Sequence, residues 1–182
     1  MEGSTRPIRD FMTPDPFAID EALTLADAAT RMREHDIRHL LVLNDQVLTG
    51  VVDGHDIDLA LAVGGRNADT RPLSTAAREP YLCSVDTPVG EVAFGMQHGR
   101  HTCAVVVDGD LAVGIFTLSD ALAMLAGQPP VHGETHASAP SLGDRDRAEL
   151  ARSRLRVRRI LSTHHAAPDP NDGQAFGKVF NR

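Results

Sequence analysis

The sequence predicts a mixed α/β fold of two β-α-β-β-α repeats, packed with pseudo-twofold symmetry and followed by a C-terminal extension. Three observations predict this fold. Residues 12–62 align without a gap on residues 76–126, at a constant offset of 64. Each copy alternates short apolar runs with helical patterns, and the composition changes after Pro130. A period of 64 is too long for a solenoid repeat and suits a duplicated small domain.

The alignment of the two copies includes eight identities and a series of conservative matches. The conservative matches include Phe17 with Tyr81 and Asp27 with Glu91. The identities are Pro16/Pro80, Ala29/Ala93, Met32/Met96, Val42/Val106, Gly50/Gly114, Asp56/Asp120, Leu61/Leu125 and Ala62/Ala126. Because the matches run through the whole copy, we interpret the chain as a tandem duplication.

The first copy is predicted to hold three short strands and two helices. Thr24 and Asp27 have the spacing of a capping box, which marks a helix start. The run Leu40–Leu43 is continuously apolar, as in a buried strand. The expected elements are a strand at 16–19, a helix capped by Thr24, strands at 40–43 and 48–52, and a helix at 55–63 that stops at Gly64.

The second copy repeats this order. Proline at position 88, after Thr87, is typical of the first turn of a helix. The triplet 108–110, Asp-Gly-Asp, predicts a hairpin between two further strands. These strands are expected at 104–107 and 112–116, and the last helix at 119–126, ended by Gly127.

The chain is therefore divided into a first repeat at 7–64, a connector at 65–75, a second repeat at 76–127 and an extension at 128–182. The extension is predicted to contain a linker, one Arg-rich helix over Asp144–Leu161 and a disordered end. Residues 1–127 carry a net charge of −10 and residues 128–182 carry +3. The helix is expected to lie on the acidic repeats; the alternatives are a solvated helix or one that contacts a partner protein or nucleic acid.

Composition excludes several classes of protein. The sequence contains no run of 18 apolar residues, so we expect no membrane span. Residues 1–10 lack the apolar stretch of a secretory signal. Two cysteines are too few for a disulfide framework or a four-cysteine zinc site, so we expect a cytoplasmic protein without a metal centre. No nucleophile triad, phosphate loop or HExxH motif occurs, so we expect no enzyme.

Three segments resemble motifs of the CBS-domain family. Residues 10–16, Asp-Phe-Met-Thr-Pro-Asp-Pro, are similar to its opening motif. Residues 114–120 match its Gly-hydrophobic-x-Thr/Ser-x-x-Asp signature in full, whereas residues 50–56 depart from it at Asp53. The resemblance covers residues 7–127 and implies a tandem CBS pair, often called a Bateman module.

The resemblance implies a regulatory sensor that binds AMP, ADP, ATP or S-adenosylmethionine between the paired copies and signals to a partner protein. It makes Asp120 the ribose ligand and Thr117 the phosphate contact, with Ser119 in the same motif. The strand around Tyr81 and Leu82 would pack on the adenine. Thr117 and Asp120 are also both suited to capping a helix, a role compatible with ligand binding.

The first copy is expected to bind differently. Asp56 corresponds to Asp120 and is a second ribose candidate, but Asp53 would repel a phosphate. Arg38 precedes the buried strand, where the family often has basic phosphate contacts; it is otherwise solvated or pairs with Asp53. We therefore expect this site to be empty or to take a nucleoside that lacks a phosphate.

The second helix of each copy carries apolar residues on more than one face. Together with the resemblance, this predicts a homodimer in which two chains form a flat disc of four domains. Two alternative functions remain: a dimerisation scaffold that binds no ligand, and a regulator that contacts nucleic acid through the Arg-rich extension. The acidic repeats, together with 4% aromatic residues, make nucleic-acid binding the less expected of the two.

Overall fold

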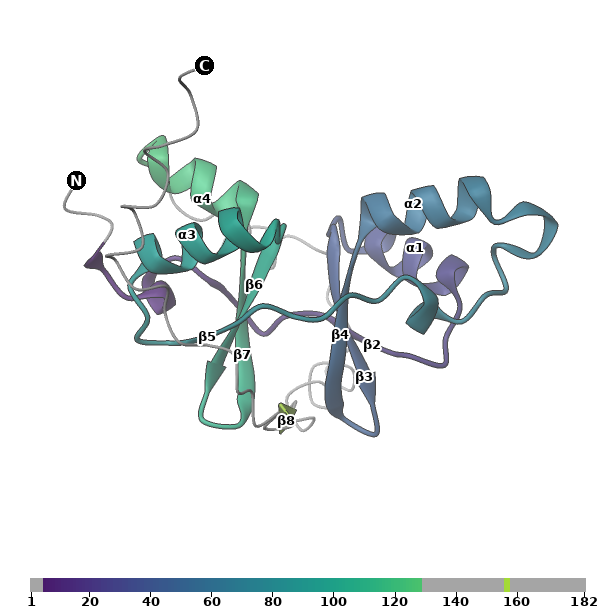
Figure 1. Cartoon of the computed structure of the whole chain (residues 1–182), viewed down its shortest axis with the longest axis horizontal. Helices are drawn as coiled ribbons and strands as arrows, with labels where there is room; N and C mark the ends of the chain where they lie inside the picture. The colour runs from purple at the N-terminus through teal and green to yellow at the C-terminus, as the bar shows by residue number, and fades with distance from the viewer. Residues whose placement is uncertain (1–4, 129–155, 158–182) are drawn as a thin grey trace, which may run out of the picture.

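The computed structural model describes residues 5–128 and 156–157. It has two lobes side by side, each with a small sheet and two helices (Figure 1). The mixed α/β fold of two repeats is thus confirmed. No helix in the described part of the chain is long and apolar enough to cross a membrane.

The first lobe contains the five elements expected from the first repeat. Strand β2 pairs in parallel with β3, and β3 pairs antiparallel with β4. The predicted capping box is present, because the Thr24 hydroxyl accepts from the Asp27 backbone and the Asp27 carboxylate accepts from the Thr24 backbone. The elements are β2 (Ala18–Asp20), α1 (Leu25–Glu34), β3 (His39–Asn44), β4 (Val47–Asp53) and α2 (Gly54–Val63).

The second lobe has the same topology. Its register repeats that of the first lobe at an offset of 64, since Val42 lies opposite Gly50 and Val106 lies opposite Gly114. Both β-hairpins also shift register directly after this pair. The elements are β5 (Leu82–Ser84), α3 (Val89–Gly99), β6 (Cys103–Asp108), β7 (Leu111–Thr117) and α4 (Leu118–Leu125).

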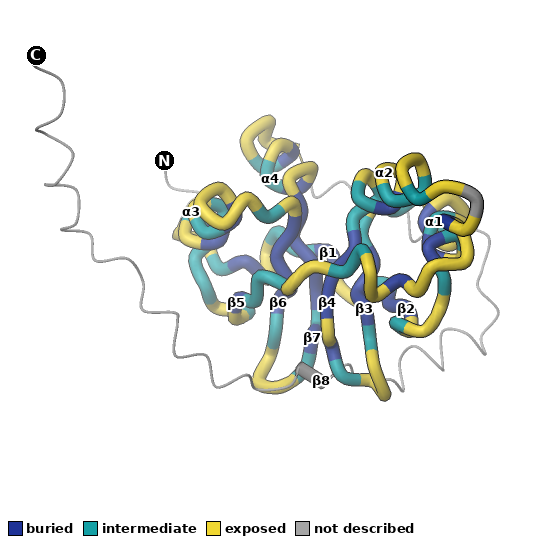
Figure 2. The backbone as a smooth tube through the Cα atoms, turned by 45° about the vertical axis from the view of Figure 1, so that its right-hand side comes forward, coloured by how far each residue is buried: buried dark blue, intermediate teal, exposed yellow. Residues whose placement is uncertain are grey.

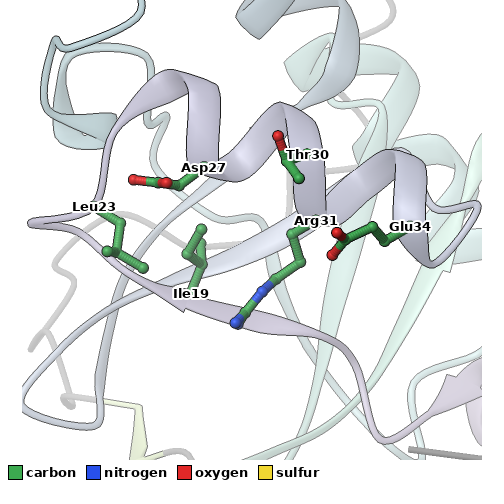
Figure 3. A pocket seen from close by; sticks show the side chains of 6 residues that line it. All are labelled: Ile19, Leu23, Asp27, Thr30, Arg31 and Glu34. Carbon is green, nitrogen blue, oxygen red and sulfur yellow. The ribbon is translucent and has the colours of Figure 1, made fainter.

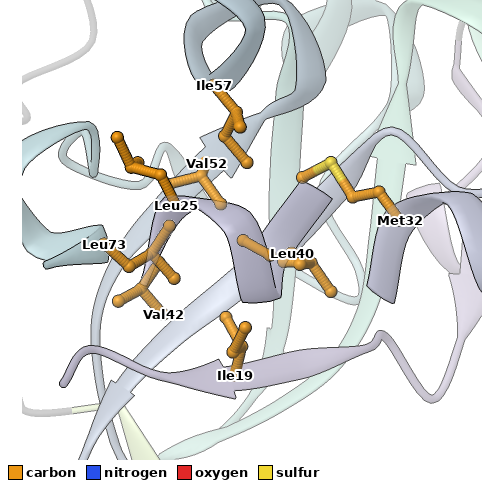
Figure 4. Close-up of a cluster of buried hydrophobic side chains, with 9 residues drawn as sticks. Ile19, Leu25, Met32, Leu40, Val42, Val52, Ile57 and Leu73 are labelled. Atoms are coloured by element: carbon orange, nitrogen blue, oxygen red, sulfur yellow. The ribbon is translucent and has the colours of Figure 1, made fainter. Parts of the chain in front are cut away.

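Three clusters of buried apolar side chains form the core. One lies in the first lobe, between its sheet and its helices, and includes Leu25, Leu40 and Ile57 (Figure 4). An equivalent cluster in the second lobe contains Val92 and Phe116. The third draws on the sheets of both lobes: Ala18, Leu41, Leu48, Val51, Cys103, Val105, Ala112 and Ile115. The two repeats therefore share one buried interface.

The segment before the first repeat packs on the second lobe. Strand β1 (Thr13–Pro14) pairs antiparallel with β7, so that Thr13 lies opposite Ile115. Ile8 is fully buried in the core of the second lobe, and its backbone N–H donates to the Thr87 carbonyl at 2.8 Å. Residues assigned to the first repeat by sequence thus stabilise the second.

The connector makes the reciprocal contact. Leu73 is fully buried in the core of the first lobe, and its N–H donates to the Leu23 carbonyl at 2.8 Å. Arg78 and Val51 of β4 exchange two backbone hydrogen bonds of 2.9 Å. Each lobe is therefore completed by the segment that precedes the first strand of the other lobe.

The C-terminal extension contributes a short strand, β8 (Arg156–Val157), instead of helix at this position. It pairs in parallel with Val47 and Leu48 of β4 and antiparallel with Leu111 of β7. The helix prediction is wrong here because the edges of β4 and β7 offer backbone groups that pair with an extended segment. The rest of Asp144–Leu161, like the other predictions for 129–155 and 158–182, lies outside the described residues.

Candidate functional site

Thr117 and Asp120 start helix α4 and form a capping box. The Asp120 Oδ2 atom accepts from the Thr117 backbone N–H at 2.8 Å and from the Thr117 hydroxyl at 2.7 Å. The Thr117 hydroxyl accepts from the Asp120 N–H at 3.3 Å. The capping interpretation is therefore confirmed. Because Thr117 donates its only hydroxyl proton to Asp120, it has none left for a phosphate.

Two buried polar atoms near this helix start have no hydrogen-bond partner among the described residues: Asp120 Oδ1 and Thr13 Oγ1. Asp120 is 1% exposed and Thr13 is 5% exposed. Thr13 lies opposite Ile115, two residues before Thr117 on β7. Buried polar atoms in native proteins almost always have partners. We name Thr13, Thr117 and Asp120 the second site; sequence reasoning missed Thr13, although it belongs to the opening motif.

The corresponding start of α2 is arranged differently. Asp53 caps this helix, with its Oδ1 atom accepting from the His55 N–H at 2.7 Å. Its Oδ2 atom lies 3.5 Å from Nε2 of His39. The proposed pairing of Arg38 with Asp53 is wrong, because His39 is the residue opposite Asp53 in the β3–β4 register, while Arg38 precedes the strand and is exposed.

Asp56, the counterpart of Asp120, forms an ion pair with Arg78. Its side chain is 16% exposed, whereas that of Arg78 is 70% exposed. We name Asp53, Asp56 and Arg78 the first site. Sequence reasoning missed Arg78, because nothing in the local pattern shows that the chain before β5 lies against β4.

The remaining predicted site residues are spread around the second lobe. Ser119 is exposed in the first turn of α4. Leu82 packs on the apolar cluster shared by the two sheets, whereas Tyr81 packs on the core of its own lobe. The Tyr81 ring stacks on His101 at 5.2 Å, and its hydroxyl lies against Gly95 of α3. Tyr81 and Leu82 therefore occupy opposite sides of the chain.

The two lobes meet at the starts of β3 and β6. His39 Nε2 lies 3.2 Å from the Thr102 hydroxyl of the other lobe. Cys103, next to Thr102, is buried at the start of β6. The two helix starts that carry the first and second sites are thus linked across the interface between the repeats.

Both cysteines are expected to be unreactive in the folded protein. Burial raises the pKa of Cys83 to about 12, and burial with the nearby Asp53 charge raises the pKa of Cys103 to about 12. Because these pKa values exceed the ordinary value of 9, the resulting stability is present below pH 9 and is lost as pH rises from about 9 toward 12. At pH 8, a thiol reagent should label neither cysteine until the protein is unfolded in guanidinium. Rapid labelling of the native chain would contradict this.

A separate hollow of about 320 Å³ lies on the outside of the first lobe (Figure 3). None of the predicted site residues lines it. Two of its polar side chains already have structural contacts, since Asp27 belongs to the capping box and Arg31 donates to the Ala18 carbonyl at 3.1 Å. Its lining residues are Ile19, Leu23, Asp27, Thr30, Arg31 and Glu34.

The chain is similar to proteins of known sequence and structure. It is 24% identical over 113 residues to the CBS domain-containing protein YhcV of Bacillus subtilis, covering 62% of this chain and 81% of the relative. An uncharacterized conserved protein from Pyrococcus horikoshii is 29% identical, with a TM-score of 0.62 over 67% of this chain and 93% of that structure.

Two similar structures contain adenosine ligands. The CBS domain of a bacterial CNNM/CorC family Mg²⁺ transporter, in complex with ATP, is 23% identical, with a TM-score of 0.61, and the match covers 70% of this chain and 92% of that one. The CBS pair of protein MJ0100, in complex with 5′-methylthioadenosine and S-adenosyl-L-methionine, is 24% identical, with a TM-score of 0.60. The match covers 66% of this chain and 96% of that one.

The CBS-domain family profile matches two stretches of this chain, residues 8–63 and 74–127. These stretches correspond to the two lobes and include both helix starts described above. CBS pairs are generally regulatory modules without catalytic groups of their own. The chain belongs to the CBS-domain family and carries two CBS domains in tandem.

Proposed function

We propose that this chain is a regulatory module that binds an adenosine-containing ligand at the second site and signals its occupancy to a partner protein. The observation that carries the proposal is the buried Asp120 Oδ1 atom, which has no partner among the described residues. A ribose hydroxyl supplies the donor that this carboxylate oxygen lacks. The ligands seen in the similar transporter and MJ0100 structures support an adenosine compound.

The remaining groups of the site have distinct roles in this proposal. Asp120 Oδ2 keeps its hydrogen bonds at the start of α4, while Oδ1 of the same carboxylate accepts from the ribose. The phosphate contact falls to Ser119, which is exposed in the first turn of α4 and retains a hydroxyl donor, rather than to Thr117. The start of α4 favours negative charge because of the helix dipole. Leu82, which packs on the cluster between the two sheets, supplies the apolar contact for the adenine in this proposal.

A thermal-shift screen of the full chain tests the proposal. The panel is adenosine, AMP, ADP, ATP and S-adenosylmethionine, with guanosine as the control for base recognition. A ligand at 100 times its Kd should add about 2.7 kcal/mol to the free energy of unfolding. If no adenosine compound at millimolar concentration raises the melting temperature above the guanosine control, the sensor function is wrong and the scaffold alternative takes its place.

We also propose that the chain forms a homodimer through α2 and α4. Helices α2 and α4 lie on the same side of the molecule (Figures 1 and 2), and both carry exposed leucines. Leu122 is 66% exposed and Leu59 is 53% exposed, whereas Met124 packs partly on the core of its own lobe. Burial of a leucine side chain contributes about 1.5–3 kcal/mol, so a second copy would stabilise this surface.

Leu122→Arg is expected to convert the dimer to a monomer, because it places a charge in the centre of the proposed contact. Analytical ultracentrifugation of the parent and variant measures the change. Asp110→Arg, at the hairpin on the far side of the second lobe, is the control for added positive charge and should leave the dimer intact. A monomeric parent chain would rule out the dimer, and a dimeric Leu122→Arg variant would place the interface elsewhere.

A further inference from the structure

Arg78 and Thr13 occupy equivalent positions in the two lobes. Arg78 lies opposite Val51 of β4, and Thr13 lies opposite Ile115 of β7. Val51 and Ile115 are 64 residues apart and correspond in the repeat. Arg78 and Thr13, each of which precedes the first strand of the other lobe, therefore stand at the same place relative to the two helix starts, although the sequence alignment pairs Arg78 with Pro14.

This equivalence exposes a difference in charge between the two sites. In the first site the Arg78 guanidinium pairs with the Asp56 carboxylate. In the second site the residue at this position is Thr13, which is uncharged and whose hydroxyl makes no hydrogen bond within the described chain. Asp120 has no cationic partner among the described residues and keeps one oxygen without a hydrogen bond.

We propose that Arg78 determines the specificity of the CBS pair by closing the first site to ribose. The guanidinium pairs with Oδ1 of the carboxylate that would accept the ribose hydroxyls, so a nucleoside must displace it or bind through Oδ2 alone. Hydrogen bonds to a charged group contribute enough that this competition lowers affinity about tenfold or more. The inference rests on the proposed function, because it assumes that Asp120 binds ribose at the second site.

Asp53 makes the two sites differ in a second way, which determines the choice of probe. Its charge stands at the start of α2, where the second site has Thr117. A phosphate would therefore be repelled from the first site even without Arg78. Adenosine carries no phosphate, so it tests the effect of Arg78 alone.

The experiment is isothermal titration of the full chain with adenosine. The parent chain is expected to bind one adenosine per chain, and Arg78→Thr, which copies Thr13, is expected to bind two. Arg78→Lys keeps a cation that can pair with Asp56 and should bind one. Arg71→Thr removes an exposed arginine of the connector and should also bind one adenosine. Adding Asp56→Asn to Arg78→Thr should abolish the new site. Circular dichroism confirms that each variant is folded.

The outcomes separate this inference from the proposed function. No binding by the parent, with one new site in Arg78→Thr, supports the closing role of Arg78 and contradicts adenosine binding at the second site. One site in both chains overturns the inference and leaves the proposed function intact. Two sites in the parent would overturn the inference, because Arg78 would then not close the first site. Weaker binding after Arg78→Thr would also overturn it, because Arg78 would then contact the ligand. No binding of adenosine in either chain overturns the inference, and the thermal-shift panel then decides the proposed function.

Discussion

A fragment that ends at Gly64 is expected to be unfolded, although it contains every helix and strand of the first repeat. The fragment loses Leu73, which is fully buried in the core of the first lobe. Loss of one buried leucine side chain costs about 2–5 kcal/mol, a large share of the 5–15 kcal/mol typical of a domain. The fragment also exposes its half of the cluster shared by the two sheets, including Leu41 and Val51.

A second fragment of equal length, residues 15–78, provides the matched control. It lacks the N-terminal segment that packs on the second lobe and retains both Leu73 and Arg78. We expect fragment 15–78 to be more ordered than fragment 1–64 in circular dichroism and thermal melts, and the full chain to unfold cooperatively. A cooperative transition in fragment 1–64 at or above that of fragment 15–78 would show that the exchanged segments are not needed.

Asp120→Asn is expected to reduce adenosine-ligand affinity by about tenfold to a hundredfold, since a hydrogen bond to a charged group contributes about 1.5–3 kcal/mol. The amide oxygen can keep the helix cap in place of Oδ2. The amide nitrogen then stands in place of Oδ1, where it donates and cannot accept from a ribose hydroxyl. Because the shape is kept, the loss of affinity exceeds the loss of stability.

Titration calorimetry with the ligand that gives the largest thermal shift measures this effect. Asp56→Asn is the matched control, because the same change at the first site should leave binding at the second site unchanged. Equal affinity of Asp120→Asn and the parent chain would place the ligand outside the second site. A loss in both variants would mean that the two helix starts act together on one ligand.

The local features of this protein were accessible from its sequence. The Thr24–Asp27 capping box and the apolar run at Leu40 depend on neighbours within a few residues, and each predicts an element that the structure contains. Capping and strand formation are local preferences, so they can be recognised without a partner segment. The candidate role of Asp120 likewise came from a motif seven residues long.

The tertiary structure decided which segments meet. The exchange of residues before each repeat, the Arg78–Asp56 pair and the place of β8 between β4 and β7 join positions far apart in the chain. Sequence reasoning offered Arg38 as one possible partner of Asp53, whereas the strand register places His39 opposite it. These contacts follow from how two assembled sheets align, a property of the whole fold. The sequence by itself therefore determined the elements of the two repeats, their duplication and the difference at Asp53, while packing of the chain before β5 against β4 decided that Arg78 pairs with Asp56.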